Sequence, residues 1–273
     1  MKNISWYALT RYCWVRAIYG FLRALGPDPV AINGTAKLNS HLLKISDFNV
    51  KEAALNIKTE SWTTLPSLCE DAVKSIYEYS LTGKGRRPSF NKDEEVYLSD
   101  IIDGKLVSGE PAIMLRVNPD GCNVINDLSE DPTLMDLAEA YLGYKPRHVE
   151  AQLLWSFHKV DMSLKERHRL AQAVFYHWDS MAVNGFRVNY YLTDVDEGAG
   201  AHVLIPKSHK RKPLKYIFTK STTADEQPLL DYYGSPELIV GKAGSGFAQD
   251  VNGFHKALPP ETADRLHLHL RYT

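Results

Sequence analysis

The sequence predicts a mainly β protein with flanking helices. Short apolar runs typical of strands recur through the second half of the chain, and turns that contain Gly or Pro separate them. A β-barrel with appended helices also commonly takes about this length, and 273 residues can bury a large core as one domain. We therefore expect a single soluble domain built around a β-barrel.

The first 90 residues are expected to form a helical region that buttresses the barrel, and residues 91–273 to form its core. The segment from Ile4 to Leu25 is apolar and aromatic, carries three arginines and no acidic residue, and ends at Gly26-Pro27. Charges interrupt it well short of the ~20 apolar residues of a membrane span, so neither a transmembrane helix nor a secretory signal is expected. Packing on the barrel is the simpler expectation; contact with a membrane surface or a partner is the alternative.

Further elements follow in order along the chain. A second helical stretch is expected near Trp62 to Tyr79, and the basic loop at residues 83–88 after it reads as a solvated connection. Strand candidates then lie at Ala151–His158, Phe186–Leu192 and His202–Ile205.

A short motif between the first two of these strands carries metal-binding chemistry. His177 and Asp179 lie two residues apart, and His255 lies far downstream in a Gly-Phe-His-Lys segment. Alternate side chains of a strand share a face, so the pair could bind one metal ion that His255 reaches from a distant strand. Two histidines and one carboxylate leave coordination positions open, which is typical of non-heme Fe(II) oxygenases. A rival motif of similar form is His148-Val149-Glu150.

The last strand candidate, Arg265–Arg271, alternates polar residues with leucines. This alternation predicts a half-buried strand, so Arg265 can point into a barrel lumen while the leucines pack outward against helices. His267 and His269 share the face of Arg265, and we expect them to be hydrogen-bonded or pocket-lining rather than a second metal site.

The order of these features resembles a known family. An H-x-D, a strand, a Gly-containing turn, the Pro-x-Ser-His of residues 206–209, His255 and then Arg265 are similar to the phytanoyl-CoA dioxygenase-like branch of the Fe(II)/2-oxoglutarate oxygenases. The resemblance covers Leu128 to Thr273, and residues 128–143 are similar to the helix before the family's first main strand.

The resemblance implies a double-stranded β-helix, or jelly roll of the cupin type, and roles for individual residues. His177, Asp179 and His255 match the iron ligands, and Arg265 matches the residue that binds the distal carboxylate of 2-oxoglutarate. Trp155 is similar to a residue that lines the family's cosubstrate site. Two positions depart from the family: Asn189 stands near the cosubstrate where some members have an aromatic, and Lys207 replaces the usual glycine of the P-G-S-H turn.

The resemblance also implies an activity with Fe(II), 2-oxoglutarate and O2. We expect decarboxylation of 2-oxoglutarate to succinate, coupled to hydroxylation or desaturation of a small-molecule or carrier-bound metabolite. Related halogenases lack the carboxylate ligand, so Asp179 favours hydroxylation or desaturation over halogenation. The alternative is a non-catalytic jelly roll that binds a metal or a ligand, although it would be expected to have lost a ligand or Arg265.

Composition limits the partners. A formal net charge of -1 argues against nucleic-acid binding, which needs a basic surface. The three cysteines form no zinc or disulfide pattern and point to a reducing cytoplasm. The basic run from Lys207 to Lys215 is either an exposed loop or a site that favours an anionic or carrier-linked substrate.

Overall fold

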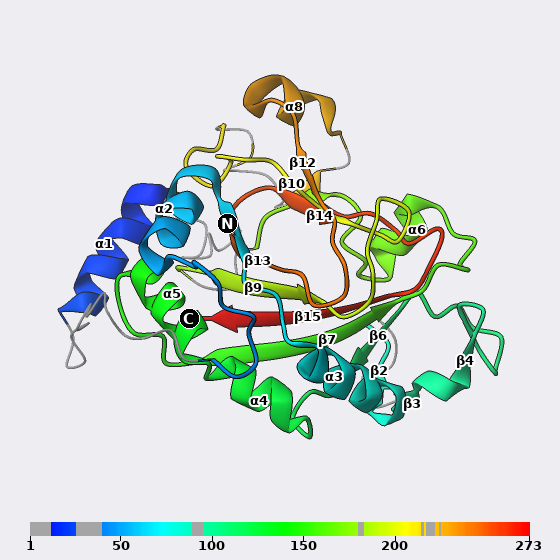
Figure 1. Ribbon diagram of the computed structural model, residues 1–273. Coiled ribbons are helices and arrows are strands. Elements are labelled where there is room, and N and C mark those ends of the chain that lie inside the picture. Colours follow the sequence, from blue (N-terminus) through cyan, green and yellow to red (C-terminus); the bar gives the residue numbers. More distant parts are fainter. Residues whose placement is uncertain are drawn as a thin grey trace.

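The computed structural model describes residues 12–25, 40–88, 95–179, 183–213, 216, 222–223 and 225–273. Two antiparallel sheets form its centre (Figure 1). The large sheet has the order β1 (Trp62–Leu65), β13 (Gly246–Asp250), β9 (Phe186–Tyr191), β15 (Arg265–Tyr272), β7 (Val149–Ser156), β6 (Met114–Val117), β2 (Lys84–Arg86) and β3 (Val96–Tyr97). The small sheet has the order β11 (Thr222–Thr223), β8 (Tyr176–His177), β14 (His255–Ala257), β10 (His202–Leu204) and β12 (Glu237–Ile239).

The chain passes back and forth between these sheets. β7, β9, β13 and β15 belong to the large sheet, whereas β8, β10, β12 and β14 belong to the small one. This alternation of successive strands between two facing antiparallel sheets is the jelly-roll arrangement. The predicted fold class is therefore confirmed.

Hydrogen bonds between the sheets show that their inner faces meet. His202 of β10 and Gln249 of β13 are joined by a bond of 3.0 Å between Nε2 and Oε1. The hydroxyl of Tyr191 in β9 donates to the carbonyl of Ile239 in β12 at 2.8 Å. A polar lumen therefore lies between the two sheets.

The outer face of the large sheet packs against helices, as the alternation at the C-terminus predicts. Leu266, Leu268, Leu270 and Tyr272 are fully buried, and their cluster includes side chains from the helices below the sheet in Figure 1. The helices are α1 (Cys13–Ala24), α2 (Val50–Glu60), α3 (Glu70–Thr82), α4 (Asn123–Ser129), α5 (Pro132–Leu142), α6 (Leu164–Arg169) and α8 (Gln227–Tyr233). A 3-10 turn, η2 (Leu98–Asp100), and the hairpin of β4 (Ile101–Ile102) and β5 (Lys105–Leu106) complete the elements.

The helix expected at residues 128–143 is present but begins later. Asp131 caps α5, since its carboxylate accepts the backbone N–H groups of Thr133 at 2.9 Å and Leu134 at 3.3 Å. Pro132 occupies the first turn, where its missing N–H costs nothing. Gly143 ends the helix with a φ of 79°, in the left-handed region that favours glycine.

The N-terminal region differs from a purely helical expectation. Residues 62–65, expected as the start of a helix, form β1 and pair with β13, and α3 begins only at Glu70. The basic loop contributes β2, and its Arg87 is buried and forms a 2.7 Å ion pair with Glu110. The first 90 residues thus supply strands to the large sheet as well as helices. Within the described ranges, no helix combines the length and apolarity needed to cross a bilayer.

Candidate metal centre

His177, Asp179 and His255 meet at one point of the lumen. His177 and His255 are register partners in β8 and β14, and one ligand atom from each of the three residues lies within 4.8 Å of the others. The Asp179 carboxylate is 3.8 Å from His177 Nε2 and 3.9 Å from His255 Nε2. Among the described residues this is the one group with the spacing of a metal site.

Backbone carbonyl groups determine that Nδ1 of each imidazole carries a hydrogen. A carbonyl can only accept, so Nδ1–H of His177 donates to Phe175 O at 3.0 Å, and Nδ1–H of His255 donates to Gly253 O at 2.9 Å. The lone pair of each ring then lies on Nε2, the atom that faces Asp179. Metal-binding histidines are commonly oriented by such a second hydrogen bond.

His255 is prepared as a neutral ligand. Its side chain is buried, and its Nε2 atom has no hydrogen-bond partner among the described residues. Burial, together with the nearby His177, lowers the pKa of His255 to about 3. A buried polar atom without a partner is costly, and a divalent metal ion at this point would satisfy it. The donor set of two nitrogens and one carboxylate oxygen fits Fe(II).

Asp179 is held in place by its side chain and its backbone. Arg187 Nη2 donates to its carboxylate at 2.5 Å, and its backbone N–H donates to Val251 O at 2.8 Å. Burial alone would raise the pKa of Asp179, but the charge and hydrogen bond of Arg187 together with the nearby His255 and His177 outweigh it, and the pKa lies well below its usual range. Arg187 was not identified from the sequence. Its alternation with Asn189 along β9, two residues on, is the signal that places it in the lumen.

Arg265 also points into the lumen, and its charge is unmatched. The side chain is buried; it donates to the carbonyl of Gly200 and to Ser156 Oγ at 3.3 Å, while Nε has no partner. None of the described carboxylates forms a salt bridge with it, and burial lowers its pKa. A buried guanidinium whose partners are all neutral is a strong site for an incoming anion.

The competing residues are engaged elsewhere. Arg271, on the same face of β15, is ion-paired with Glu150. Glu150 also accepts from Gln152 Nε2 at 2.7 Å, and His148 is exposed at the start of β7. The rival His148-Val149-Glu150 motif therefore forms no metal site in the described part of the chain.

Asn189 lies in the lumen, opposite His269 in the sheet register. It is fully buried, its Nδ2 donates to Phe247 O at 3.3 Å, and its Oδ1 lacks a partner. His267 and His269 bond to each other, with 2.9 Å between Nδ1 and Nε2. The contact agrees with the expectation that the two histidines are hydrogen-bonded.

The structure does not bring Trp155 to the lumen. Ser156 is the register partner of Arg265, whereas Trp155 is opposite Leu266 on the outer face of the sheet. Its ring packs against Tyr77 of α3, with 5.8 Å between centroids. The expected cosubstrate contact of Trp155 is therefore wrong, because adjacent residues of a strand point to opposite faces.

The Pro-x-Ser-His turn keeps the backbone that a glycine would favour. Lys207 has a φ of 64°, in the left-handed region that favours glycine. The basic run around this turn is not one exposed surface: Lys212 is buried and its ammonium donates to Ser208 O at 3.1 Å and to Asn252 O. Lys215 lies outside the described residues.

Comparison with solved structures gives consistent matches over most of the chain. The chain is similar to SnoN, a non-heme alpha-ketoglutarate-dependent epimerase from nogalamycin biosynthesis, with 15% identity, 82% of each chain covered and a TM-score of 0.56. EctD from S. alaskensis, with 2-oxoglutarate and 5-hydroxyectoine, is 16% identical over 88% of this chain and 79% of that one, with a TM-score of 0.56. HygX from Streptomyces hygroscopicus, with nickel, 2-oxoglutarate and hygromycin B bound, is 14% identical over 81% and 86%, with a TM-score of 0.56.

The chain has the fold of these proteins. No family model matches the sequence, and no curated protein does either. At such low identity the likeness extends to the fold alone, so the chemistry has to be argued from the side chains of the lumen.

Proposed function

We propose that this protein is an Fe(II)/2-oxoglutarate-dependent oxygenase. The observation that carries the proposal is the pairing, in one lumen, of an open three-ligand face with a buried arginine that has no carboxylate partner. His177, Asp179 and His255 would hold the iron, since one potential ligand atom of each lies within 4.8 Å of the others and Nε2 of His255 has no hydrogen-bond partner among the described residues. The solved structures of similar fold support the assignment, since SnoN is in complex with Fe3+ and alpha ketoglutarate, EctD with Fe or with 2-oxoglutarate, and HygX with nickel and 2-oxoglutarate.

Arg265 would bind the distal carboxylate of 2-oxoglutarate. Its guanidinium lies on the lumen face of β15 and bonds only to neutral groups. A carboxylate can accept two parallel, charge-assisted hydrogen bonds from a guanidinium. The dianionic cosubstrate would thus bridge the buried cation and the metal. When bound, the iron supplies the open positions at which 2-oxoglutarate and O2 react, yielding succinate, CO2 and an oxidised substrate.

Two other residues would prepare the site. Arg187 holds the Asp179 carboxylate in its charged, ligating form, as the 2.5 Å contact indicates. Asn189 offers a buried Oδ1 without a partner, which suits a hydroxyl or N–H of the cosubstrate or substrate.

The carboxylate ligand favours hydroxylation or desaturation of a small molecule over halogenation. The turn with Lys207 and the position of Arg265 support the phytanoyl-CoA dioxygenase-like branch, and three unpaired cysteines support a reducing cytoplasm.

The decisive experiment is succinate production by the purified protein. Succinate should form only with both Fe(II) and 2-oxoglutarate present and O2 admitted, and it should be measured without a prime substrate and with a metabolite mixture. Gain of one oxygen, or loss of two hydrogens, in a metabolite then identifies the substrate by mass spectrometry. Iron binding without any succinate would contradict the proposal and favour a non-catalytic metal-binding barrel.

Arg265→Ala and Arg271→Ala form a matched pair. Both residues lie on the lumen face of β15, but only Arg271 is matched by a carboxylate, that of Glu150. Arg265→Ala should weaken 2-oxoglutarate binding by about 3–5 kcal/mol, because the cosubstrate loses its buried charged partner. Titration of the nickel-loaded protein with 2-oxoglutarate measures this. Unchanged affinity in the Arg265 variant, with loss in the Arg271 variant, would transfer the role to Arg271.

A further inference from the structure

The outward face of α1 consists of apolar side chains. Trp14, Ile18, Phe21, Leu22 and Leu25 recur at helical spacing, and each is between 52% and 67% exposed. A helix on the surface of a soluble domain ordinarily turns polar residues outward and apolar ones inward. The outward face of α1 shows the reverse pattern.

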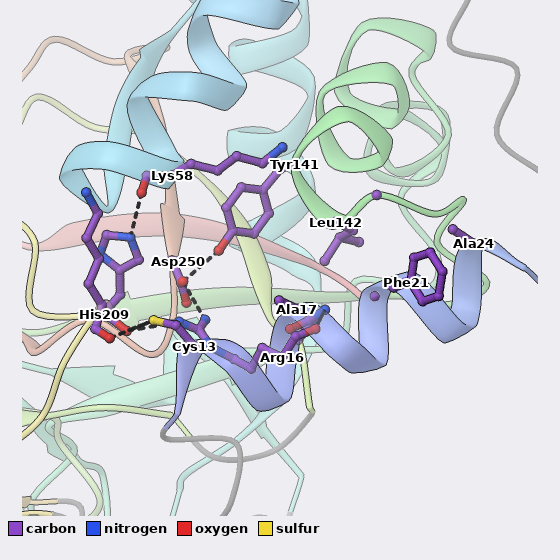
Figure 2. A pocket seen from close by; sticks show the side chains of 14 residues that line it. Cys13, Arg16, Ala17, Phe21, Ala24, Lys58, Tyr141, Leu142, His209 and Asp250 are labelled. Carbon is purple, nitrogen blue, oxygen red and sulfur yellow. Dashed lines mark hydrogen bonds and ion pairs between the residues drawn. The ribbon is translucent and has the colours of Figure 1, made fainter.

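The two charged residues of α1 are turned inward. Arg16 is buried and forms a 2.6 Å ion pair with Asp250 of β13, as Figure 2 shows. Arg23 lies over the ring of Tyr144, 4.7 Å from its centroid. These contacts remove the helix's charges from the outward face and leave that face apolar. The arginines attach α1 to the domain, so the exposed side is free for another contact.

Cations flank the apolar face on one side. A cavity of about 520 Å³ lies between α1, α2 and α5, and Phe21, Leu142 and Lys58 line it (Figure 2). Lys210 also lines this cavity. Lys58 donates to Ala140 O at 2.8 Å, and burial lowers its pKa. Neither lysine forms a salt bridge with a described residue. An anion beside them would therefore be stabilised without breaking an existing ion pair.

We propose that α1 docks the protein on an anionic lipid surface. Its apolar side chains would enter the headgroup boundary while Lys58 and Lys210 face lipid phosphates. Apolar residues on one face, including a tryptophan, with cations at the flank are the pattern of helices that lie in the membrane interface. With 12 residues, α1 would lie along the surface. A second copy of the chain fits less well, because a two-fold contact through α1 would bring the same unpaired lysines together.

Vesicle co-sedimentation of the full chain tests the proposal. The protein should sediment with vesicles in which about a third of the phosphatidylcholine is replaced by phosphatidylglycerol, and binding should weaken with salt. Phe21→Glu combined with Leu22→Glu should reduce the partition coefficient at least about 100-fold, because two large apolar groups no longer enter the interface. Lys210→Ala should reduce it about fivefold, as expected for one cation near the surface.

Matched controls come from the hairpin of β4 and β5, which lies far from α1 in Figure 1. Ile102 and Val107 are as exposed as the α1 residues, so their glutamate variants should sediment like the unaltered protein, as should Lys105→Ala. Equal binding to pure phosphatidylcholine, or no binding to either vesicle, would overturn the proposal. So would a dimer, seen by size exclusion with light scattering, that the Phe21 and Leu22 changes dissociate while vesicle binding is absent.

Discussion

Two aspartates of the barrel, Asp179 and Asp250, are each paired with an arginine, yet the Asp250 side chain is fully buried whereas that of Asp179 is 17% exposed. Asp250 accepts from Arg16 Nη1 and Tyr141 OH, each at 2.6 Å, and from the backbone N–H of Asn252 at 2.8 Å. Both oxygens of its carboxylate therefore accept hydrogen bonds from within the protein.

Asp179 instead forms no hydrogen bond with the two histidines beside it. It accepts from Arg187, but the two Nε2 atoms that face it lie at 3.8 and 3.9 Å, too far for hydrogen bonds. Despite the burial of both carboxyl groups, the paired arginines hold both pKa values well below the usual range. A lowered pKa therefore does not distinguish a metal ligand from a structural ion pair. The unsatisfied atoms around the carboxylate do.

Lowering the pH should produce the largest difference between the lumen around Asp179 and the Asp250 ion pair. Burial lowers the pKa of His202, His255, His267 and His269 in the lumen. Below about pH 6.5 the unfolded chain binds protons that the folded lumen excludes, so stability rises with pH in this window and falls as pH drops toward 3. Each histidine contributes up to about 1.4 kcal/mol per pH unit. Thermal unfolding of the metal-free protein from pH 7 to 5 measures the loss.

Asp250 should play no part in that acid transition. Its folded pKa lies below the unfolded value of 3.8, so its contribution is complete above pH 3.8 and is lost only as pH falls further. An Asp250 variant should therefore show at least the same slope between pH 7 and 5, since loss of the Asp250 charge can only lower the pKa of the neighbouring His209 further. A flat stability profile over that range would contradict the neutral, buried state of the lumen histidines.

Asp250→Ala should cost about 3–5 kcal/mol of unfolding free energy, because it leaves the buried Arg16 guanidinium without its partner. Chemical denaturation at neutral pH measures this loss. Asp250→Asn, which keeps an oxygen for Tyr141, should retain part of the stability. The nickel affinity of the folded protein should change little in comparison. A large fall in both stability and nickel affinity would show that the Asp250 ion pair and the metal site are not independent.

Asp179→Ala should show the opposite pattern. Metal affinity should fall more than about 100-fold, beyond the upper end of what loss of an outer partner costs, and succinate formation should stop. Unfolding of the metal-free protein should change much less than in the Asp250 variant, since Arg187 is partly exposed to the lumen. Calorimetry with nickel measures the metal affinity, and denaturation with a chelator present measures the unfolding free energy of the metal-free protein.

Tyr141→Phe is the smallest of these changes. It removes one hydrogen bond to the charged Asp250 carboxylate and leaves the Arg16 ion pair intact. Such a bond contributes about 1.5–3 kcal/mol, so the loss should lie at or below that of Asp250→Ala. The same denaturation experiment measures it, and a larger loss than in Asp250→Ala would contradict this account, because the phenylalanine keeps the ring packing and only the hydroxyl bond to the carboxylate is removed.

The sequence predicted the elements whose patterns are local. The alternation from Arg265 to Arg271 fixed which residues share a face, and the structure confirms that its leucines are buried on the outer side. The H-x-D and His255 were found because ligand chemistry restricts residue type and spacing. The lumen position of Arg187 could also have been predicted, because it is two residues from Asn189 on the same strand and therefore shares its face.

Other features depend on pairing that no local pattern contains. Trp155 and Ser156 are neighbours on one strand, and only the register with β15 decides which of them faces the lumen. The Arg16–Asp250 pair joins residues 234 positions apart, so it could not be read from the sequence. The sequence predicts a helix over the residues of β1 because four residues are too few to show a strand period, and the pairing of β1 with β13 decides its conformation.

The step from Asp250 to Val251 brings the two regions within one peptide unit of each other. The Asp250 side chain is tied to α1 through Arg16, and the carbonyl of Val251 accepts the backbone N–H of Asp179. A small displacement of the helix would thus reach the ligand's main chain through two hydrogen bonds and one peptide plane. A paramagnetic ion such as Co(II) placed at Asp179 would then report the position of α1 in its optical spectrum, with no label on the helix itself.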